Sequence, residues 1–126
     1  LAAIPREACF QWGLFDREPL PRWTVGRATL LGDAAHAMLP FLGQGAAMAI
    51  EDGLVLARAL ADSDGAERGL ERYEAARRER ATFVQLKSRA VPKVFHAANT
   101  DDYDAGRHQT EEALGLFAYD PVTVSI

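Results

Sequence analysis

Residues 28–45 read ATLLGDAAHAMLPFLGQG, and this stretch decides the fold. Its first four residues are largely apolar, which predicts a short buried strand of the kind that parallel sheets contain. Gly32 and Asp33 follow directly, and a loop that contains Gly43 and Gly45 then leads into an alanine-rich segment. A buried strand followed by a glycine-bracketed loop and a helix indicates an α/β protein that binds a ligand at the carboxyl end of the strand.

Two strands are expected, separated by a loop that belongs to neither. Apolar and other side chains alternate over residues 7–15 (EACFQWGLF), and this period of two is typical of a strand. Prolines in the segment DREPLPRW, residues 16–23, break the pattern and predict a connecting loop. A turn at residues 26–27 then precedes the second strand, residues 28–31.

The helical periodicity predicts one helix over about residues 45–60, a longer one over about 66–90 and a short one over 108–117. Pro92 is expected to end or kink the long helix. The charged residues of the long helix are expected to form a solvated face, with Glu74 and Arg78 paired across one turn. These charged residues are Glu67, Arg68, Glu71, Arg72, Glu74, Arg77, Arg78, Glu79 and Arg80.

The composition is that of an ordinary globular protein. The 126 residues are 48% hydrophobic and 25% charged, which excludes a disordered polar tract, a collagen-like repeat and a disulfide-dense mini-protein. The formal net charge of −4 argues against nucleic acid as a partner. No apolar run reaches the ~18 residues of a membrane span and no secretory signal is seen, so the expected location is the cytoplasm. Because the sequence opens on Leu1 without a leading methionine, we interpret it as a fragment of a longer protein.

Asp33 and the Gly43-Gln44-Gly45 loop each admit two interpretations. A carboxylate just past a buried strand can accept hydrogen bonds from a sugar-like hydroxyl, but an Asp there also commonly caps the next helical turn. The loop either serves only as a turn or brings main-chain N–H groups against a ligand without a Cβ in the way. Because these amides open a helix, whose N-terminal end is partially positive, such a ligand would be an anion or would become anionic.

Three segments together carry a family resemblance. GRATLLGDAAHAMLPFLGQGAAMAIEDGLVLARAL (26–60) resembles the second flavin-binding motif of FAD-dependent aromatic-ring hydroxylases, in the branch of salicylate hydroxylase and 3-hydroxybenzoate 6-hydroxylase. WGLFDREPLPRW (12–23) resembles the last strand of the substrate domain and its return loop, and LERYEAARRERA (70–81) resembles the long helix that follows. The resemblance implies an α/β fold, the C-terminal portion of a Rossmann-like FAD-binding domain with a few strands followed by long helices.

The resemblance also implies a role for each residue of the motif. Asp33 would hydrogen-bond the ribityl chain of FAD, Gly32 would allow a close approach, and Ala34 would offer an amide near the pyrophosphate. Pro40 and Gln44 are the candidates nearest the catalytic chemistry. The Pro40 backbone would lie beside the reactive edge of the isoalloxazine, and Gln44 would either face the substrate hydroxyl or only shape the loop. The amides presented to the pyrimidine end of the ring would be those of Gly43, Gln44, Gly45 and Ala46.

The implied reaction is the hydroxylation of an aromatic acid or phenol. NADH or NADPH reduces FAD, O2 adds to give a flavin C4a-hydroperoxide, and the electron-rich ring takes up the distal oxygen. Water must be excluded because the hydroperoxide otherwise collapses to H2O2. The expected partners are therefore an aromatic small molecule and O2, with a homodimer as the assembly and neither a membrane nor nucleic acid involved.

Other conspicuous residues are interpreted as structural. His36 is expected to pack or to hydrogen-bond at the periphery of the cofactor, and His96 and His108 are given no role. The wide and irregular spacing of the histidines predicts no metal site. Two aromatic residues, Phe10 and Trp12, are expected in the core, with the lining of an aromatic pocket as the alternative. The expected core positions are Cys9, Phe10, Trp12, Met38 and Met48.

The chain departs from the family in what it lacks. It contains no GxGxxG unit for the ADP half of FAD and no mid-chain DG motif, because Asp52-Gly53 lies inside a predicted helix. The fragment alone is therefore expected to be inactive. Alternatives are another FAD oxidoreductase of this fold, such as an epoxidase, halogenase or dehydrogenase, or a non-enzymatic fragment whose long helix docks on a partner. The expected division is 1–22 for the last substrate-domain strand and return loop, 23–65 for the FAD-binding part, and 66–126 for the helical extension and tail.

Overall fold

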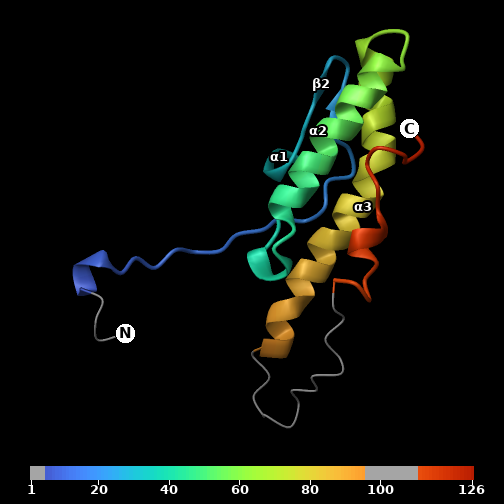
Figure 1. The fold of residues 1–126 in the computed structure, drawn as a ribbon. Coiled ribbons are helices and arrows are strands. Elements are labelled where there is room, and N and C mark those ends of the chain that lie inside the picture. Colours follow the sequence, from blue (N-terminus) through green and yellow to red (C-terminus); the bar gives the residue numbers. More distant parts are fainter. Residues whose placement is uncertain (1–4, 96–110) are drawn as a thin grey trace.

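The computed structural model describes residues 5–95 and 111–126. Two long helices, α2 and α3, lie side by side and form the body, and a small β-hairpin packs at one end of them (Figure 1). The C-terminal segment, red in Figure 1, runs along α3. The elements in chain order are η1 (Arg6–Ala8), β1 (Thr24–Val25), β2 (Ala28–Thr29), α1 (Asp33–His36), η2 (Pro40–Leu42), α2 (Gly45–Ala61), α3 (Ala66–Phe95) and η5 (Leu116–Ala118).

The helix pair is held by one buried stripe on each helix. On α2 and α3 the buried positions recur every three or four residues, which places them on a single face of each helix. Both predicted long helices are confirmed, and α3 continues through Pro92 to Phe95, so that Pro92 does not end it. The buried positions of α2 are Met48, Asp52, Val55 and Ala59. Those of α3 include Leu70, Tyr73, Arg77, Ala81, Val84 and Ser88.

The strand predicted over residues 28–31 is shorter than expected, and it belongs to an antiparallel hairpin instead of a parallel sheet. Only Ala28–Thr29 is extended, and it pairs antiparallel with Thr24–Val25 across the predicted turn, where Gly26 has φ 56°. The hairpin is fixed to α3, because the Thr24 amide donates to Glu74 Oε2 at 2.7 Å. The Leu30 amide adds one further hydrogen bond across the hairpin, to the Trp23 carbonyl at 3.2 Å, but residues 30 and 31 are not part of the strand.

The strand predicted over residues 7–15 is wrong. The backbone forms η1 and then an irregular arm that extends away from the helices (Figure 1). A strand needs a neighbour to satisfy its backbone groups, and no described segment pairs with this one. The expected burial fails with it: Cys9 is exposed, and the side chains of Phe10 and Trp12 are 75% and 82% exposed.

Two small clusters make the core. Trp23 lies between His36 and Tyr73, with ring centroids 5.6 and 5.9 Å away, and so joins the hairpin end to α1 and α3. Met48 is fully buried and the half-buried Met38 packs against it, which confirms their expected place in the core. The first cluster is Trp23, Ala35, Val55, Ala59, Tyr73 and Ala81. The second is Met48, Val84 and Leu116.

The C-terminal segment closes the second cluster. The helix predicted over 108–117 is not formed in its described part, since residues 111–115 make turns and Gly115 takes a positive φ of 67° before η5. Residues 108–110, with His96 and His108, lie outside the described residues. Arg58 anchors the segment by donating to the carbonyls of Pro121 and Val124 at 2.7 and 3.0 Å. Within the described residues, no helix has the length and apolarity that a membrane crossing requires.

Candidate functional site

A hollow of about 610 Å³ collects most of the residues that the sequence singles out. It lies between the start of α2, the turn that enters α1, and the chain around η2. We call it the glycine hollow. Two other hollows, of about 370 and 660 Å³, lie beside the hairpin and the start of α3 and contain none of the predicted site residues. The glycine hollow is lined by Leu31, Gly32, Asp33, Met38, Leu39, Pro40, Gly43, Gly45, Ala46 and Ala49.

Two glycines shape this hollow through backbone conformations that other residues rarely adopt. Gly32 has φ 59°, and a Cβ built on it would lie 3.2 Å from the Ala49 Cβ. Gly43 has φ 62° and closes η2 by donating its N–H to the Pro40 carbonyl at 2.9 Å. Because both positions lie in the left-handed region, a side chain there would be strained. The absence of side chains keeps the wall flat and brings the backbone to its surface.

Asp33 lies at the rim of the hollow as the first residue of α1. It is exposed, and the residue that caps α1 is Gly32, with no side-chain capping hydrogen bond. The interpretation of Asp33 as a helix cap is therefore wrong. Its carboxylate lines the hollow without a structural partner at the helix start, and it is free to accept hydrogen bonds from a ligand.

The N-terminus of α2 opens onto the same hollow. Gln44 is the residue before the helix and makes no side-chain capping hydrogen bond. The first amides of any α-helix lack a partner within the helix, and here two of the residues that carry them, Gly45 and Ala46, line the hollow. Aligned peptide dipoles make this end partially positive. The arrangement suits a ligand group that is negative or becomes negative.

Ala34 and Gln44 are the two predicted site residues that do not line the hollow. Ala34 is exposed, and its carbonyl accepts a hydrogen bond from the Arg17 guanidinium. Gln44 is half-buried between Gly43 and Gly45, both of which line the hollow. The structure therefore brings six of the eight predicted residues to one hollow.

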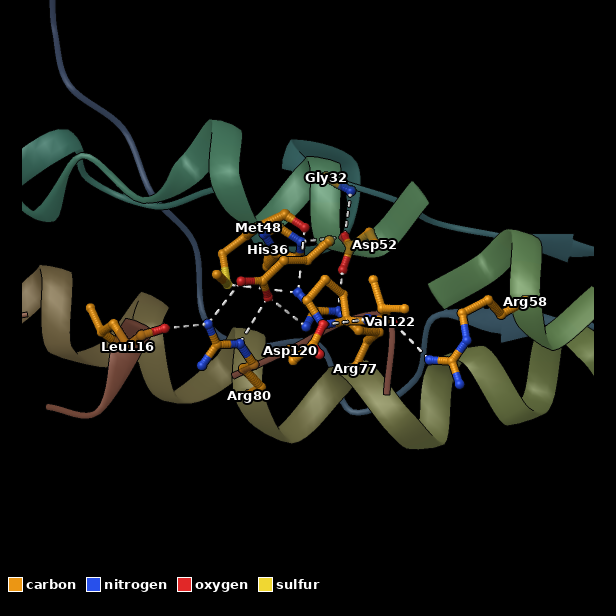
Figure 2. A network of polar contacts seen from close by, with 12 residues as sticks. Gly32, His36, Met48, Asp52, Arg58, Arg77, Arg80, Leu116, Asp120 and Val122 are labelled. Atoms are coloured by element: carbon orange, nitrogen blue, oxygen red, sulfur yellow. Dashed lines mark hydrogen bonds and ion pairs between the residues drawn. The ribbon is translucent and has the colours of Figure 1, made fainter. Parts of the chain in front are cut away.

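Beneath the Gly32 side of the hollow lies a buried polar network between α2 and α3 (Figure 2). Asp52 Oδ2 accepts hydrogen bonds from the Gly32 amide at 3.1 Å and from His36 Nε2 at 2.7 Å. Asp52 Oδ1 accepts from Arg77 Nε at 2.8 Å. Burial alone would raise the pKa of Asp52, but the hydrogen bonds from His36, Arg77 and Gly32 outweigh it and hold that pKa below its ordinary value.

Arg77 departs furthest from the predicted solvated face of α3, although the side chains of Glu74 and Arg80 are also only 13% and 14% exposed. It is not on a solvated face, because its side chain is completely buried. Burial lowers its pKa, but the hydrogen bond to Asp52 is among the interactions that reverse this and leave the pKa raised. Its Nη1 also lies 2.7 Å from Glu51 Oε2, as an ion pair without hydrogen-bond geometry. Arg80 completes the cluster with two hydrogen bonds of 2.8 Å to Glu51 and a guanidinium 4.0 Å from the Tyr119 ring centre.

The C-terminal half of α3 fixes the chain segment that forms the other wall of the hollow, opposite the Gly32 turn. Gln85 donates from its Nε2 to the carbonyls of Arg17 and Ala37, both at 2.8 Å. Ser88 donates to the Leu39 carbonyl. These bonds hold the stretch that includes Met38 and leads into η2. Since both donors are buried, the wall is held from beneath by polar groups of α3.

Asp52 and Arg77 are the important residues that the sequence interpretation missed. A signal was present, because each occupies a position in the buried stripe of its helix where an apolar residue is expected. His36 is buried and hydrogen-bonded to Asp52, as its predicted packing role requires. Over the described residues, no group of three His, Cys, Asp or Glu side chains is arranged to hold a metal ion.

The sequence is similar to those of known proteins. The sequence profile of the FAD binding domain family matches residues 12–88. A 6-hydroxynicotinate 3-monooxygenase from Pseudomonas fluorescens is 53% identical over 77 residues, covering 60% of this chain and 20% of the relative. A 3-hydroxybenzoate 6-hydroxylase from Klebsiella oxytoca is 41% identical over 92 residues, covering 72% and 23% respectively.

Solved structures show the same likeness. A salicylate hydroxylase substrate complex superposes with a TM-score of 0.74 at 34% identity, covering 87% of this chain and 29% of that one. Klebsiella pneumoniae HpxO, solved with FAD and uric acid, gives a TM-score of 0.66 at 33% identity, covering 82% and 26%. The predicted fold class, a portion of an FAD-binding domain of the aromatic-hydroxylase type, is thereby confirmed.

The present chain spans only about a fifth of the length of the curated relatives it matches. The profile match, however, runs through the hairpin, the glycine hollow, α2 and most of α3. It covers well over half of the residues, and so the chain belongs to the FAD binding domain family.

Proposed function

We propose that this chain forms one wall of the flavin site of an FAD-dependent monooxygenase that hydroxylates an aromatic acid or phenol. The observation that carries the proposal is the meeting of a free carboxylate, two positive-φ glycines and an uncapped helix N-terminus in a single hollow. Family membership and relatives named as hydroxylases of aromatic acids support the reaction class.

The polar groups and glycines of the hollow fit the parts of FAD that the family resemblance predicts beside these residues. A carboxylate such as Asp33 accepts hydrogen bonds from the hydroxyls of a sugar-like chain, and it has no competing structural bond at the start of α1. Gly32, Gly43 and Gly45 present backbone without side chains, so a flat ring can lie close. The amides at the start of α2 suit the pyrimidine edge of a flavin, which is negative when reduced.

Under this proposal, each predicted residue acts through a stated group. Asp33 accepts from the ribityl hydroxyls, and the Pro40 backbone borders the reactive edge. Ala34 and Gln44 contribute main-chain amides. Asp33, which precedes Ala34, lines the hollow, and so do both neighbours of Gln44. The amides that face the pyrimidine edge are those of Gly43, Gln44, Gly45 and Ala46.

Oxidation of NADH or NADPH and activation of O2 are the chemistry that bound FAD supplies. The residues of this chain bind, orient and exclude water. Met38, Leu39 and Pro40 form an apolar wall of the hollow and so limit the access of water. The helix dipole at Gly45 supplies fixed positive potential and needs no rearrangement during the reaction. A homodimer in the cytoplasm is part of the same proposal.

The test is made on the complete protein that carries these residues. We expect it to purify yellow with flavin absorbance, and to oxidise NADH or NADPH faster when phenolic acids are added. A colourless protein that gains no absorbance with FAD would contradict flavin binding. Bound flavin without stimulation by aromatic acids would instead favour another FAD oxidoreductase of this fold.

A further inference from the structure

Asp52 lies directly beneath the glycine hollow without lining it. Its side chain is fully buried, and its two oxygens accept from three donors that belong to different elements. The Gly32 amide comes from the turn before α1, His36 from the end of α1 and Arg77 from the middle of α3. Figure 2 shows these groups converging on one carboxylate between the two helices.

The bond to Gly32 fixes a turn that would otherwise be held on one side only. The Gly32 carbonyl accepts from the amides of Ala35 and His36 at 2.8 and 2.9 Å, within the first turn of α1. Its amide is held by Asp52 Oδ2. With both polar groups of Gly32 bound, its positive φ is fixed, and this φ sets the direction in which the next residue, Asp33, leaves the turn.

The contacts of the two ring nitrogens decide where His36 carries its hydrogen-bonding proton. Nε2 lies 2.7 Å from Asp52 Oδ2. Nδ1 is buried and has no hydrogen-bond partner among the described residues, so a proton there would be an unsatisfied buried donor. The geometry therefore places a proton on Nε2, which donates to Asp52.

We propose that Asp52 is a positioning residue of the flavin site, which links the buried Arg77 of α3 to the Gly32–Asp33 turn. The inference rests on the proposed function insofar as the positioned group, Asp33, binds FAD. Arg77 orients the carboxylate through Oδ1, and the carboxylate holds the turn and the His36 ring through Oδ2. Helix α3 thereby acts on a site that it does not line.

Asp52→Asn in the complete protein is the test, because it keeps the shape and removes one acceptor. The charged Arg77 competes more strongly for the single oxygen, so the amide NH2 turns towards Gly32, donor against donor. The NH2 then donates to His36 Nε2, and the ring proton moves to Nδ1. In the apoprotein we expect exchange of the Gly32 amide to accelerate about tenfold or more. We also expect the 15N signals of His36 to report the other tautomer.

Glu51→Gln is the matched control. It is the adjacent residue of the same helix and contacts the same arginine, but it does not contact Gly32 or His36. We expect Asp52→Asn to weaken FAD binding about tenfold, as changes to residues behind a ligand site commonly do, and Glu51→Gln to leave it unchanged. If Asp52 had a purely structural role, both variants would lose thermal stability. The His36 tautomer and the rate of Gly32 amide exchange would then be the same in Asp52→Asn as in Glu51→Gln.

The outcomes separate this inference from the proposed function. If Asp52→Asn frees the Gly32 amide but binds FAD as tightly as wild type, the positioning role is wrong while flavin binding stands. If no form of the protein binds FAD, the proposed function is wrong, whatever the amide does. Should the variant fail to fold, the wild-type apoprotein decides: a Gly32 amide that exchanges as fast as that of the exposed turn residue Gly26 overturns the inference.

Discussion

Replacing Asp33 with alanine should remove flavin binding and leave the fold intact. Asp33 is exposed and makes no capping hydrogen bond to α1, whose cap position is occupied by Gly32. Its carboxylate therefore contributes little to the free energy of folding. The same carboxylate lines the glycine hollow and is the acidic group there. Truncation at Cβ takes this group away without disturbing the turn.

The two effects differ enough in size to be told apart. A surface substitution without a structural bond changes the free energy of unfolding by about 0.5 kcal/mol or less. Loss of a hydrogen bond to a charged group costs about 1.5–3 kcal/mol, which corresponds to an FAD affinity weakened by about 10- to 150-fold. Asp33→Asn, which keeps an acceptor oxygen but no charge, should fall between alanine and wild type.

The assay is titration of the apoprotein with FAD, followed by flavin absorbance, beside urea unfolding of the same samples. Asp64→Ala is the control, because Asp64 is also an exposed acid but lies in the loop between α2 and α3, outside the hollow. The reasoning is refuted if Asp33→Ala binds FAD like wild type. It is also refuted if its loss of binding is matched by an equal loss of unfolding free energy.

Three further predictions concern stability. Arg77→Met should cost about 3–5 kcal/mol in urea unfolding because it leaves buried Asp52 without its cation. Asp52→Leu combined with Arg77→Met should cost less, because it leaves no unpaired buried charge and only the Gly32 amide and His36 Nε2 lose their acceptor. Since the pKa of Asp52 lies below its ordinary 3.8, its ionised form stabilises the fold above that pH, and this contribution is lost as the pH falls through the folded pKa. Urea midpoints between pH 7 and pH 3 should therefore fall less steeply in Asp52→Asn. Gly43→Ala, at φ 62°, should lose about 1–2 kcal/mol, while Gly53→Ala, with open space in a helix interior, should gain up to about 1 kcal/mol.

The long helices could be predicted from sequence because their signals are local. The stripe of α2 and the stripe of α3 repeat every three or four residues, and the polar segment around Asp62 separates them. Strands carry no such self-sufficient signal. The alternation over residues 7–15 is real, but a strand forms only where another segment supplies hydrogen bonds, and the described part of the chain offers none to this arm.

The candidate site divides in the same way. Its glycine turns are readable from sequence because Gly32 and Gly43 are needed for backbone reasons that act within a few residues. The partnership of Asp52 with Arg77 joins residues 25 positions apart, and each alone looks like an ordinary surface charge. Their position, rather than their residue type, indicates that they are buried, because each lies in the buried stripe of its helix. Two opposite charges in facing stripes predict a buried pair once the helices are known to be antiparallel neighbours.

The buried Asp52–Arg77 pair also explains how the contact between α2 and α3 can hold a loop in place. Apolar stripes tolerate sliding, since one aliphatic contact replaces another, but a charge moved by one helical turn, about 5.4 Å, loses its partner. Arg77 therefore fixes the register of α3 against α2 through Asp52. The same carboxylate binds the Gly32 amide, so the register and the turn cannot vary independently. A hydrophobic pair at these positions would avoid the burial of charge, but it would leave the Gly32 amide buried and unbound.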